Sequence, residues 1–296
     1  MAGLTRALIT RHAAGRRDAY DAALLDVAQD HLLYLLAQLE VFSTGKLIFK
    51  GGTSLRKSRL GNDGRFSTDL DFAAPSEDVV LQACAVIDGA VVAGSTTGSA
   101  RPAAMADTGT SRSRTTNSAR PASRPAWSSL GRPLALAPEQ LAFVPLPIHR
   151  VYLFDLPVLP VVAEAEACAE KLARYRRVPL GRDLYDLYQF ARRPIDEPLV
   201  RRLWVLKVWG DVLDDGRGHG PLDSADVLTP HRPSDFAPDS IGALTRPVDI
   251  VAWEAQVRAR FGFLTALDDD EHRWAECSER HRREVDAALT ALPLRT

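Results

Sequence analysis

The sequence predicts an α+β protein, with a compact unit of strands and helices in residues 1–163 and a mainly helical part in residues 164–296. In the first part, stretches whose apolar residues have helical spacing alternate with short strand-like stretches, and turn residues lie at the ends of these strand-like stretches. In the second part, almost every apolar run has helical spacing. With 296 residues, of which 46% are hydrophobic, the chain can bury a sizeable core.

The first part contains five predicted elements in the order helix, strand, helix, strand, helix. They cover residues 18–40, 46–49, 53–60, 66–74 and 76–90. Leucines at helical spacing predict the first helix, and Gly51 and Gly52 end the first strand before a helix that Thr53 or Ser54 can cap. Alternation in the second strand predicts one apolar face and one polar face.

Residues 94–126 interrupt this pattern, because they contain no Val, Ile, Leu, Phe, Tyr or Trp. They hold five arginines and a single acid, Asp107. Such a segment cannot supply a core strand, and its composition is typical of a basic, irregular insert. Three explanations remain open: a functional loop, a disordered insert, or translation in a shifted reading frame between about residues 90 and 131.

The remaining chain begins with strand material broken by prolines and continues as helices. The predicted strand covers residues 149–162, and the helices cover 163–177, 182–193, 199–213, 248–264 and 278–292. Two of these helices, joined by a four-residue loop, form a predicted αα-hairpin.

Composition narrows the possible environments and partners. The formal net charge of -1 leaves only a local basic patch for contact with nucleic acid. Three cysteines without C-x-x-C spacing argue against a disulfide framework and a cysteine zinc site. No apolar run is long enough to span a membrane, so we expect a cytoplasmic protein with no membrane partner.

Asp69 and Asp71 stand two residues apart in the predicted strand, which places both carboxylates on one face together with Ser67. Such a pair can hold Mg²⁺ together with the phosphates of a nucleoside triphosphate. Alone, the same pattern is more typical of a solvated strand face.

Gly51 and Gly52 lie where a strand gives way to a helix, so free backbone N–H groups can receive phosphate oxygens there. The segment lacks the G-x-x-x-x-G-K-[ST] spacing of a P-loop. A glycine pair is by itself more often only a turn, so the meaning of this one depends on the rest of the site.

The stretches "KGGTSLRK" (50–57) and "RFSTDLDF" (65–72) resemble the first two motifs of the AbiEii-type nucleotidyltransferase toxins, in particular the mycobacterial MenT toxins. The stretch "EKLARYRRVPLGRDLYDL" (170–187) resembles the third and fourth motifs. The resemblance implies a DNA polymerase β-like nucleotidyltransferase core with a small mixed sheet flanked by helices, and a helical part that completes the active site.

The resemblance also implies roles for individual residues. Asp69 and Asp71 would bind Mg²⁺, with room for two ions, and Ser67, Lys171 and Asp186 would complete the catalytic set. The nucleotide-binding residues would be Gly51, Gly52, Thr53, Ser54, Lys57 and Asp183.

Lys171 is one of only five lysines in a chain that uses arginine for almost every basic position. A compact ammonium suits the charge that accumulates on a departing pyrophosphate. Without the other motifs, Lys171 reads as a helix lysine paired with Glu170 or Glu166. The predicted αα-hairpin brings it towards Asp183 and Asp186.

One feature departs from the polymerase β-like pattern, which usually includes a third carboxylate on a later strand. That strand is expected within residues 95–131, where the sequence indicates no strand and "AWSSLGRP" offers no acid. The third carboxylate is therefore dispensable, replaced by Asp183 or Asp186, or lost with the reading frame.

By resemblance, the predicted function is transfer of a nucleoside monophosphate from an NTP to the 3′ end of tRNA by a toxin that has a cognate antitoxin. Four arginines near the motif lysine, Arg174, Arg176, Arg177 and Arg182, would bind RNA or form a solvated helix face. Two alternatives remain: transfer to a small molecule or a protein hydroxyl, and a catalytically inactive relative that binds RNA or protein.

Overall fold

The structure is a computed structural model that describes residues 4–42, 47–89, 91–92, 95–96, 126–129, 134–237 and 240–292. Its strands are β1 (Ile48–Lys50), β2 (Asp71–Ala74), β3 (Val91–Val92), β4 (Ser95–Thr96), β5 (Ala126–Ser129), β6 (Glu139–Leu141) and β7 (Leu159–Val161). Its helices are α1 (Arg6–His12), α2 (Tyr20–Gln38), α3 (Gly51–Leu55), α4 (Glu77–Gly89), α5 (Glu164–Arg177), α6 (Gly181–Ala191), α7 (Glu197–Leu213), α8 (Ala225–Leu228), α9 (Ile250–Arg260), α10 (Asp269–Ala275) and α11 (Arg282–Ala291).

Five strands form a mixed sheet in the order β5-β2-β1-β7-β6. The pairs β1/β2 and β6/β7 are antiparallel, whereas β1/β7 and β2/β5 are parallel. The strands β3 and β4 form a separate two-stranded ladder. The predicted α+β class with a small mixed sheet is therefore confirmed.

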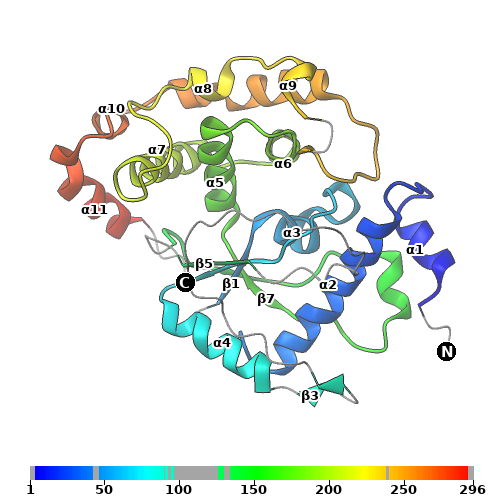
Figure 1. Ribbon diagram of the computed structural model, residues 1–296. Coiled ribbons are helices and arrows are strands. Elements are labelled where there is room, and N and C mark those ends of the chain that lie inside the picture. Colours follow the sequence, from blue (N-terminus) through cyan, green and yellow to red (C-terminus); the bar gives the residue numbers. More distant parts are fainter. Residues whose placement is uncertain are drawn as a thin grey trace, which may run out of the picture.

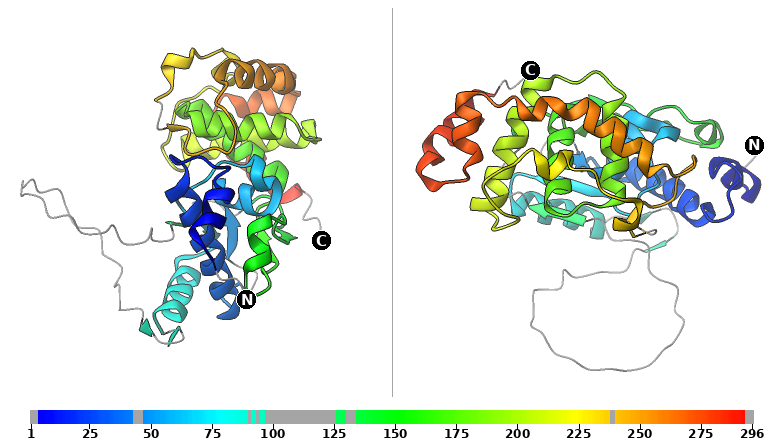
Figure 2. Two further views of the ribbon diagram at one scale, coloured as in Figure 1. Left: turned by 90° about the vertical axis from the view of Figure 1, so that its right-hand side faces the viewer. Right: turned by 90° about the horizontal axis from the view of Figure 1, so that it is seen from above.

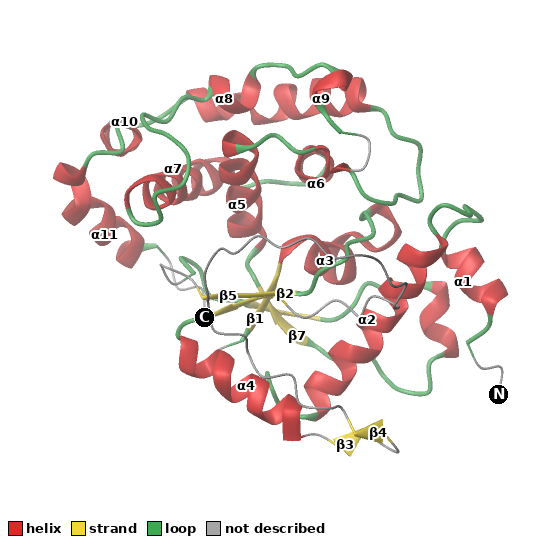
Figure 3. Ribbon diagram, in the orientation of Figure 1, coloured by secondary structure: helices red, strands yellow, loops and turns green. Residues whose placement is uncertain are grey.

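The sheet lies between two groups of helices (Figures 1 and 3). Helices α2 and α4 lie on one side of it, and α3 lies on the other, beneath the layer that α5 to α11 form. The side view in Figure 2 shows the same division, with the C-terminal helices stacked on the part that contains the sheet.

One hydrophobic core runs through both parts of the chain. Phe49 and Phe72 on the central strands belong to it, as do Trp204 and Trp209 on α7, and all four side chains are fully buried. The predicted division at residue 163 falls at the junction between β7 and α5. It stays a prediction, because the core continues across it.

The strand that carries the two aspartates is shorter than predicted. It begins at Asp71 rather than at residue 66, and Thr68, expected on the apolar face, is exposed. The preceding loop is held by contacts other than a ladder, since the Phe66 N–H donates to Ala243 O and the Thr53 hydroxyl donates to Asp69 O. Asp69 therefore lies on a loop.

The expectation that residues 95–131 contain no sheet strand is wrong. Strand β5 pairs with β2 from Asp71↔Ala126 to Ala74↔Ser129 and forms one edge of the sheet. A ladder of this kind is made by backbone groups and does not require a strand-like composition. Residues 97–125, which include most of the basic insert, lie outside the described residues.

Several other elements differ from the prediction. Of the strand expected over residues 149–162, only Leu159–Val161 pairs in the sheet, and Pro147–Val151 forms a short 3₁₀ helix. The sequence patterns did not predict α1, β6, α8 and α10. The three helices have seven residues or fewer, and the strand has three. Periodicity carries little information over such short lengths.

Candidate active site

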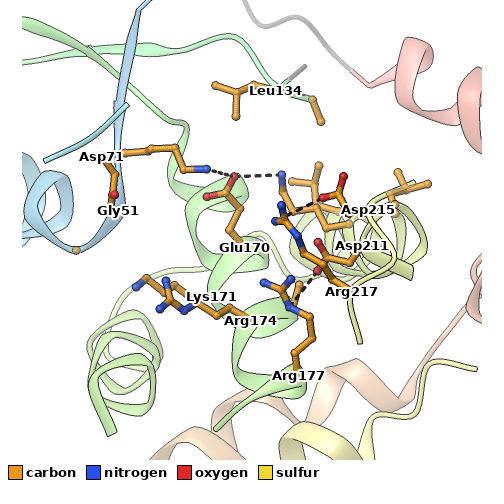
Figure 4. Close-up of a pocket in the computed structure, with 18 of the residues that line it drawn as sticks. Gly51, Asp71, Leu134, Glu170, Lys171, Arg174, Arg177, Asp211, Asp215 and Arg217 are labelled. Carbon is orange, nitrogen blue, oxygen red and sulfur yellow. Dashed lines mark hydrogen bonds and ion pairs between the residues drawn. The ribbon is translucent and has the colours of Figure 1, made fainter. Parts of the chain in front are cut away.

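A pocket of about 390 Å³ lies where β1 and the residues around the start of β2 face helices α5, α6 and α7 (Figure 4). Two groups of predicted site residues, separated by 100 positions between Asp71 and Lys171, line it together. They are Gly51, Gly52, Ser67, Asp69 and Asp71 from the sheet side, and Lys171, Arg174, Arg177 and Arg182 from the helical side.

The two glycines are required by close contacts. Gly51 has a φ of 80°, and a Cβ atom at this position would collide with the Asp71 carboxylate. A Cβ atom on Gly52 would collide with the guanidinium of Arg65. Helix α3 begins at Gly51 rather than at Thr53, so both glycines belong to its first turn. Their unobstructed backbone therefore forms part of the pocket wall next to the carboxylates.

The hydroxyl groups that follow the glycines point away from the pocket. The buried Thr53 hydroxyl donates to the carbonyl of Asp69 at 2.5 Å, and the buried Ser54 hydroxyl donates to the carbonyl of Gly51 at 2.9 Å. Neither residue lines the pocket. Their side chains hold the Asp69 loop and the glycine turn in place, so the predicted contact with a triphosphate is not supported for these hydroxyls.

Lys57 does not belong to the pocket either. It is buried, and its ammonium lies 2.7 Å from carboxylate oxygens of both Asp26 and Asp30 on α2. Arg56 binds the same Asp26 carboxylate at 2.9 Å. The end of the "KGGTSLRK" motif therefore anchors the segment after α3 to α2, and this arrangement does not support the nucleotide-binding role predicted for Lys57.

Asp69 and Asp71 both face the pocket, Asp69 from the exposed loop and Asp71 from the first position of β2. Burial and the nearby negative charge of Asp69 raise the pKa of Asp71, against the opposing effect of Lys50, Lys171 and Arg174. A divalent cation between the two carboxylates would relieve this repulsion.

The donor set fits Mg²⁺ bound by two carboxylates and completed by substrate phosphates and water. Among the residues that the structure describes, no three His, Cys, Asp or Glu side chains gather closely enough to hold a metal ion alone.

Lys171 lies at the centre of a buried ion-pair cluster. Its ammonium is 3.0 Å from Asp183 and 2.7 Å from Asp186, and not paired with Glu170 or Glu166. Burial alone would raise the pKa of Asp186, but Arg65 and Lys171 outweigh it and hold this pKa below its ordinary value. Asp183 and Asp186 do not line the pocket, so they orient the cations that do. The geometry gives neither acid the place of a third metal ligand.

The predicted RNA-binding arginines divide into two groups. Arg174, Arg177 and Arg182 line the pocket, whereas the buried side chain of Arg176 pairs with Asp226 at 2.8 Å and does not reach it. Arg174 pairs with Asp183 at 3.1 Å, and Arg177 pairs with Asp211 at 3.4 Å. Arg182 has no ion pair with an acid in the described part of the chain. An interface role for Arg176 is therefore not supported.

The pocket also contains residues to which the sequence analysis assigned no role, although three of them, Lys50, Arg65 and Glu170, begin the quoted motif stretches. Arg65 joins Asp186 to Ser67, and Glu170 pairs with both Lys50 and Lys207. The scarcity of lysine was the available signal for Lys50 and Lys207. For Arg65 and Glu170 the available signal was their position within the second and third motif stretches. Overall, eight Lys and Arg side chains face six Asp and Glu side chains among the described lining residues, which favours an anionic ligand.

Comparison with known proteins identifies the family. The model of the family described as "Nucleotidyl transferase AbiEii toxin, Type IV TA system" matches residues 34–291. The chain belongs to the AbiEii family of nucleotidyltransferase toxins.

Among solved structures, MenT4, a nucleotidyltransferase toxin from Mycobacterium tuberculosis H37Rv, is 60% identical with a TM-score of 0.82. The match covers 98% of this chain and 99% of that one. No curated protein matches the chain significantly.

Membership of the AbiEii family makes the chain a nucleotidyltransferase toxin whose fold is that of the MenT enzymes. It implies an NTP substrate and an antitoxin partner. In the described ranges, no helix is both long and apolar enough to cross a bilayer.

Proposed function

We propose that this protein is a Mg²⁺-dependent enzyme that transfers a nucleoside monophosphate from an NTP to the 3′ end of tRNA and thereby blocks translation. The observation that carries the proposal is the pocket in which the Asp69–Asp71 pair and the Gly51–Gly52 backbone face Lys171 and three arginines. Carboxylates for a metal and cations for phosphates are the two requirements of phosphoryl chemistry.

Each side of the pocket would serve a different part of the nucleotide. Asp69 and Asp71 would hold Mg²⁺ against the phosphate that is transferred, while the backbone of Gly51 and Gly52 approaches the phosphate chain. Mg²⁺ supplies positive charge that polarises the phosphoryl group and helps to align it. Lys171, held by Asp183 and Asp186, faces the leaving group.

The reaction joins the acceptor hydroxyl oxygen to the α-phosphorus and releases the hydroxyl proton to solvent, while the bond from that phosphorus to the bridging oxygen of pyrophosphate breaks. Lys171 and Arg174 would neutralise charge on the pyrophosphate as it forms. Because the Lys171 ammonium is fixed by two buried carboxylates, little reorganisation is needed at the moment of transfer. Ser67, which lines the pocket, would lie beside the reacting groups.

The acceptor would approach over the helical side, where Arg177 and Arg182 line the pocket and Arg217 extends with a largely exposed side chain. Guanidinium groups bind phosphate well, so this rim suits an RNA backbone. We also propose that the enzyme acts in the cytoplasm, where its tRNA substrate and a protein antitoxin would meet it.

The test is to incubate the purified chain with total tRNA, MgCl₂ and all four NTPs and to sequence the tRNA 3′ ends. We expect added nucleotides on a subset of tRNAs, and no addition with Asp69→Ala or with EDTA. Total protein and small alcohols are offered in parallel reactions with α-labelled NTPs.

Label in protein or in a small alcohol, with unmodified tRNA, would replace the tRNA proposal by one of the other acceptors. A wild type that binds no NTP and matches Asp69→Ala in every reaction would support the inactive relative instead.

A further inference from the structure

Lys50 is a pocket residue to which none of the steps above gives a role. It ends β1 directly before Gly51, and the antiparallel β1–β2 register places it opposite Asp71. Its side chain is 16% exposed and lines the pocket. Its ammonium forms an ion pair with Glu170 on α5. A lysine is thus fixed beside the carboxylate predicted to bind metal.

Lys50 belongs to a series of ion pairs that fixes the position of its side chain. The Lys50 ammonium lies 3.1 Å from Glu170, whose carboxylate is also 3.5 Å from Lys207. Lys207 lies 2.8 Å from Glu166, and this second carboxylate accepts the backbone N–H groups of Ala135 and Leu136. Burial alone would raise the pKa of Glu170, but Lys207 and Lys50 outweigh it and hold this pKa below its ordinary value.

This series of ion pairs has no net charge, because it contains two lysines and two glutamates. Glu170 is shared between two ammonium groups and therefore does not fully neutralise Lys50. An ammonium has three N–H donors, and the contacts that hold Lys50 in place use one of them, the hydrogen bond to Glu170. The others are available to a ligand in the pocket.

The metal-binding side of the pocket contains few charges. It has two carboxylates, and the strand next to β2, Ala126–Ser129, contains no acid that could hold a second ion in the way a third carboxylate would. Lys171 and Arg65 both form ion pairs with Asp186. Lys50 lies opposite Asp71 in the β1–β2 register and forms one hydrogen bond, to Glu170, among the described residues, so it is placed to reach a phosphate held at Asp71.

We propose that Lys50 is a further substrate-binding residue that donates a hydrogen bond to a non-bridging oxygen of the α-phosphate, in the place that a second metal ion would otherwise occupy. The inference rests on the proposed function, because it requires the reacting phosphate to lie at Asp71. No bond forms or breaks at the lysine nitrogen. Its positive charge stabilises the charge on the phosphoryl oxygens during transfer.

The first experiment measures nucleotide binding without metal. Equilibrium dialysis in EDTA with each of the four NTPs compares wild type with Lys50→Gln and Lys50→Met. We expect the dissociation constant to rise roughly tenfold in both variants, as for loss of one charge-assisted hydrogen bond. Lys50→Arg should retain most of the affinity. Lys50→Gln keeps a donor for Glu170 and remains informative if Lys50→Met does not fold.

Lys207→Gln is the matched control. It removes the other lysine bound to Glu170 but lies on α7, whereas Lys50 lies opposite Asp71, so it should change the metal-free dissociation constant much less than Lys50→Gln. Equal effects of the two variants would mean that the ion-pair chain matters only for structure, and would overturn the assignment.

The second experiment places the contact on the α-phosphate. Single-turnover transfer is measured with the two diastereomers of the α-thiotriphosphate of whichever NTP is used. Sulfur in the position that contacts Lys50 should slow the wild type and slow Lys50→Gln much less. If the ratio of the transfer rates with the two diastereomers is the same in Lys50→Gln as in the wild type, the proposed contact with the α-phosphate is contradicted.

The inference and the proposed function fail in different ways. A wild type that modifies no tRNA contradicts the proposed function, while the metal-free binding comparison still decides whether Lys50 contacts the nucleotide. A wild type that is active and binds NTP no better than Lys50→Gln contradicts the inference alone.

Discussion

Gly52 is a residue at which the absence of a Cβ atom matters for the site. A Cβ atom there would collide with the guanidinium of Arg65, and Arg65 in turn binds Asp186 in the cluster that fixes Lys171. We expect Gly52→Ala to lower the rate of nucleotide transfer about 100-fold, the cost of displacing reacting groups by roughly 1 Å. Gly262→Ala is the control, because a Cβ atom at Gly262 meets nothing within 4 Å. Equal activities of the two variants would contradict this reading.

Asp71 should make the protein less stable in the absence of metal. Its pKa is raised by burial and by Asp69, so the folded chain holds a proton there more tightly than the unfolded chain. The free energy of unfolding therefore decreases as pH rises through the interval between these two pKa values. Asp71→Asn should raise the Tm at pH 7 in EDTA by about 1–2 °C, with a gain that shrinks as pH falls towards about 4.

In the presence of Mg²⁺, the wild type should become more stable than Asp71→Asn. It should raise the Tm of the wild type, because binding to the folded state stabilises it, and leave Asp71→Asn almost unchanged. Calorimetry with and without Mg²⁺ measures both effects. A variant that is less stable than wild type in EDTA at pH 7 would show that the carboxylate is not under strain.

At the scale of elements, the hairpin of α5 and α6 acts as one unit through Lys171 and Asp186. Removal of either partner leaves a buried charge under-compensated, and we expect Lys171→Met or Asp186→Asn each to cost roughly 3 kcal/mol of stability. The double variant should lose clearly less than the sum, because the two residues share one interaction. Urea unfolding of the four proteins gives the coupling free energy.

The pair Arg260–Glu197 provides the comparison, since it is partly exposed and joins α9 to α7. A double-mutant cycle there should give a coupling below about 1 kcal/mol. Additive costs at Lys171 and Asp186 would mean that the hairpin does not hold them as a unit.

The sequence predicted these elements unevenly. Long helices such as α2, α5 and α7 were predicted to within a few residues because their apolar faces repeat over several turns. The strand β5 was missed because an edge strand can pair through its backbone alone. The start of α3 was misplaced because Lys50, with no side-chain capping bond, precedes it instead of a Ser or Thr.

The same unevenness holds for the site. Spacing predicted that Asp69 and Asp71 lie together, and both line the pocket, although Asp69 does so from a loop and not from the strand; the resemblance added Lys171 and Asp186. The sequence could not show that Lys57 pairs with Asp26 and Asp30, because that contact depends on how α2 packs against the segment after α3. Long-range ion pairs of this kind have no local signature in a single sequence.

For the molecule as a whole, a net charge of -1 means that attraction to RNA must come from a local basic patch, and the pocket rim is the patch proposed above. Arg177, Arg182 and Arg217 line that rim, and three phosphate contacts would give a slope of roughly -2 to -3 in a plot of log affinity against log salt concentration. Arg182, which has no acid partner in the described residues, should contribute fully. Arg182→Ala should therefore reduce the slope by about one.

The matched variant is Arg150→Ala, which removes an exposed arginine that does not line the pocket. It should leave the slope unchanged, although both variants have the same net charge. Filter binding of total tRNA at four salt concentrations distinguishes the two cases. If both substitutions change the slope equally, RNA responds to the overall charge of the molecule, and the pocket rim is not where the acceptor end binds.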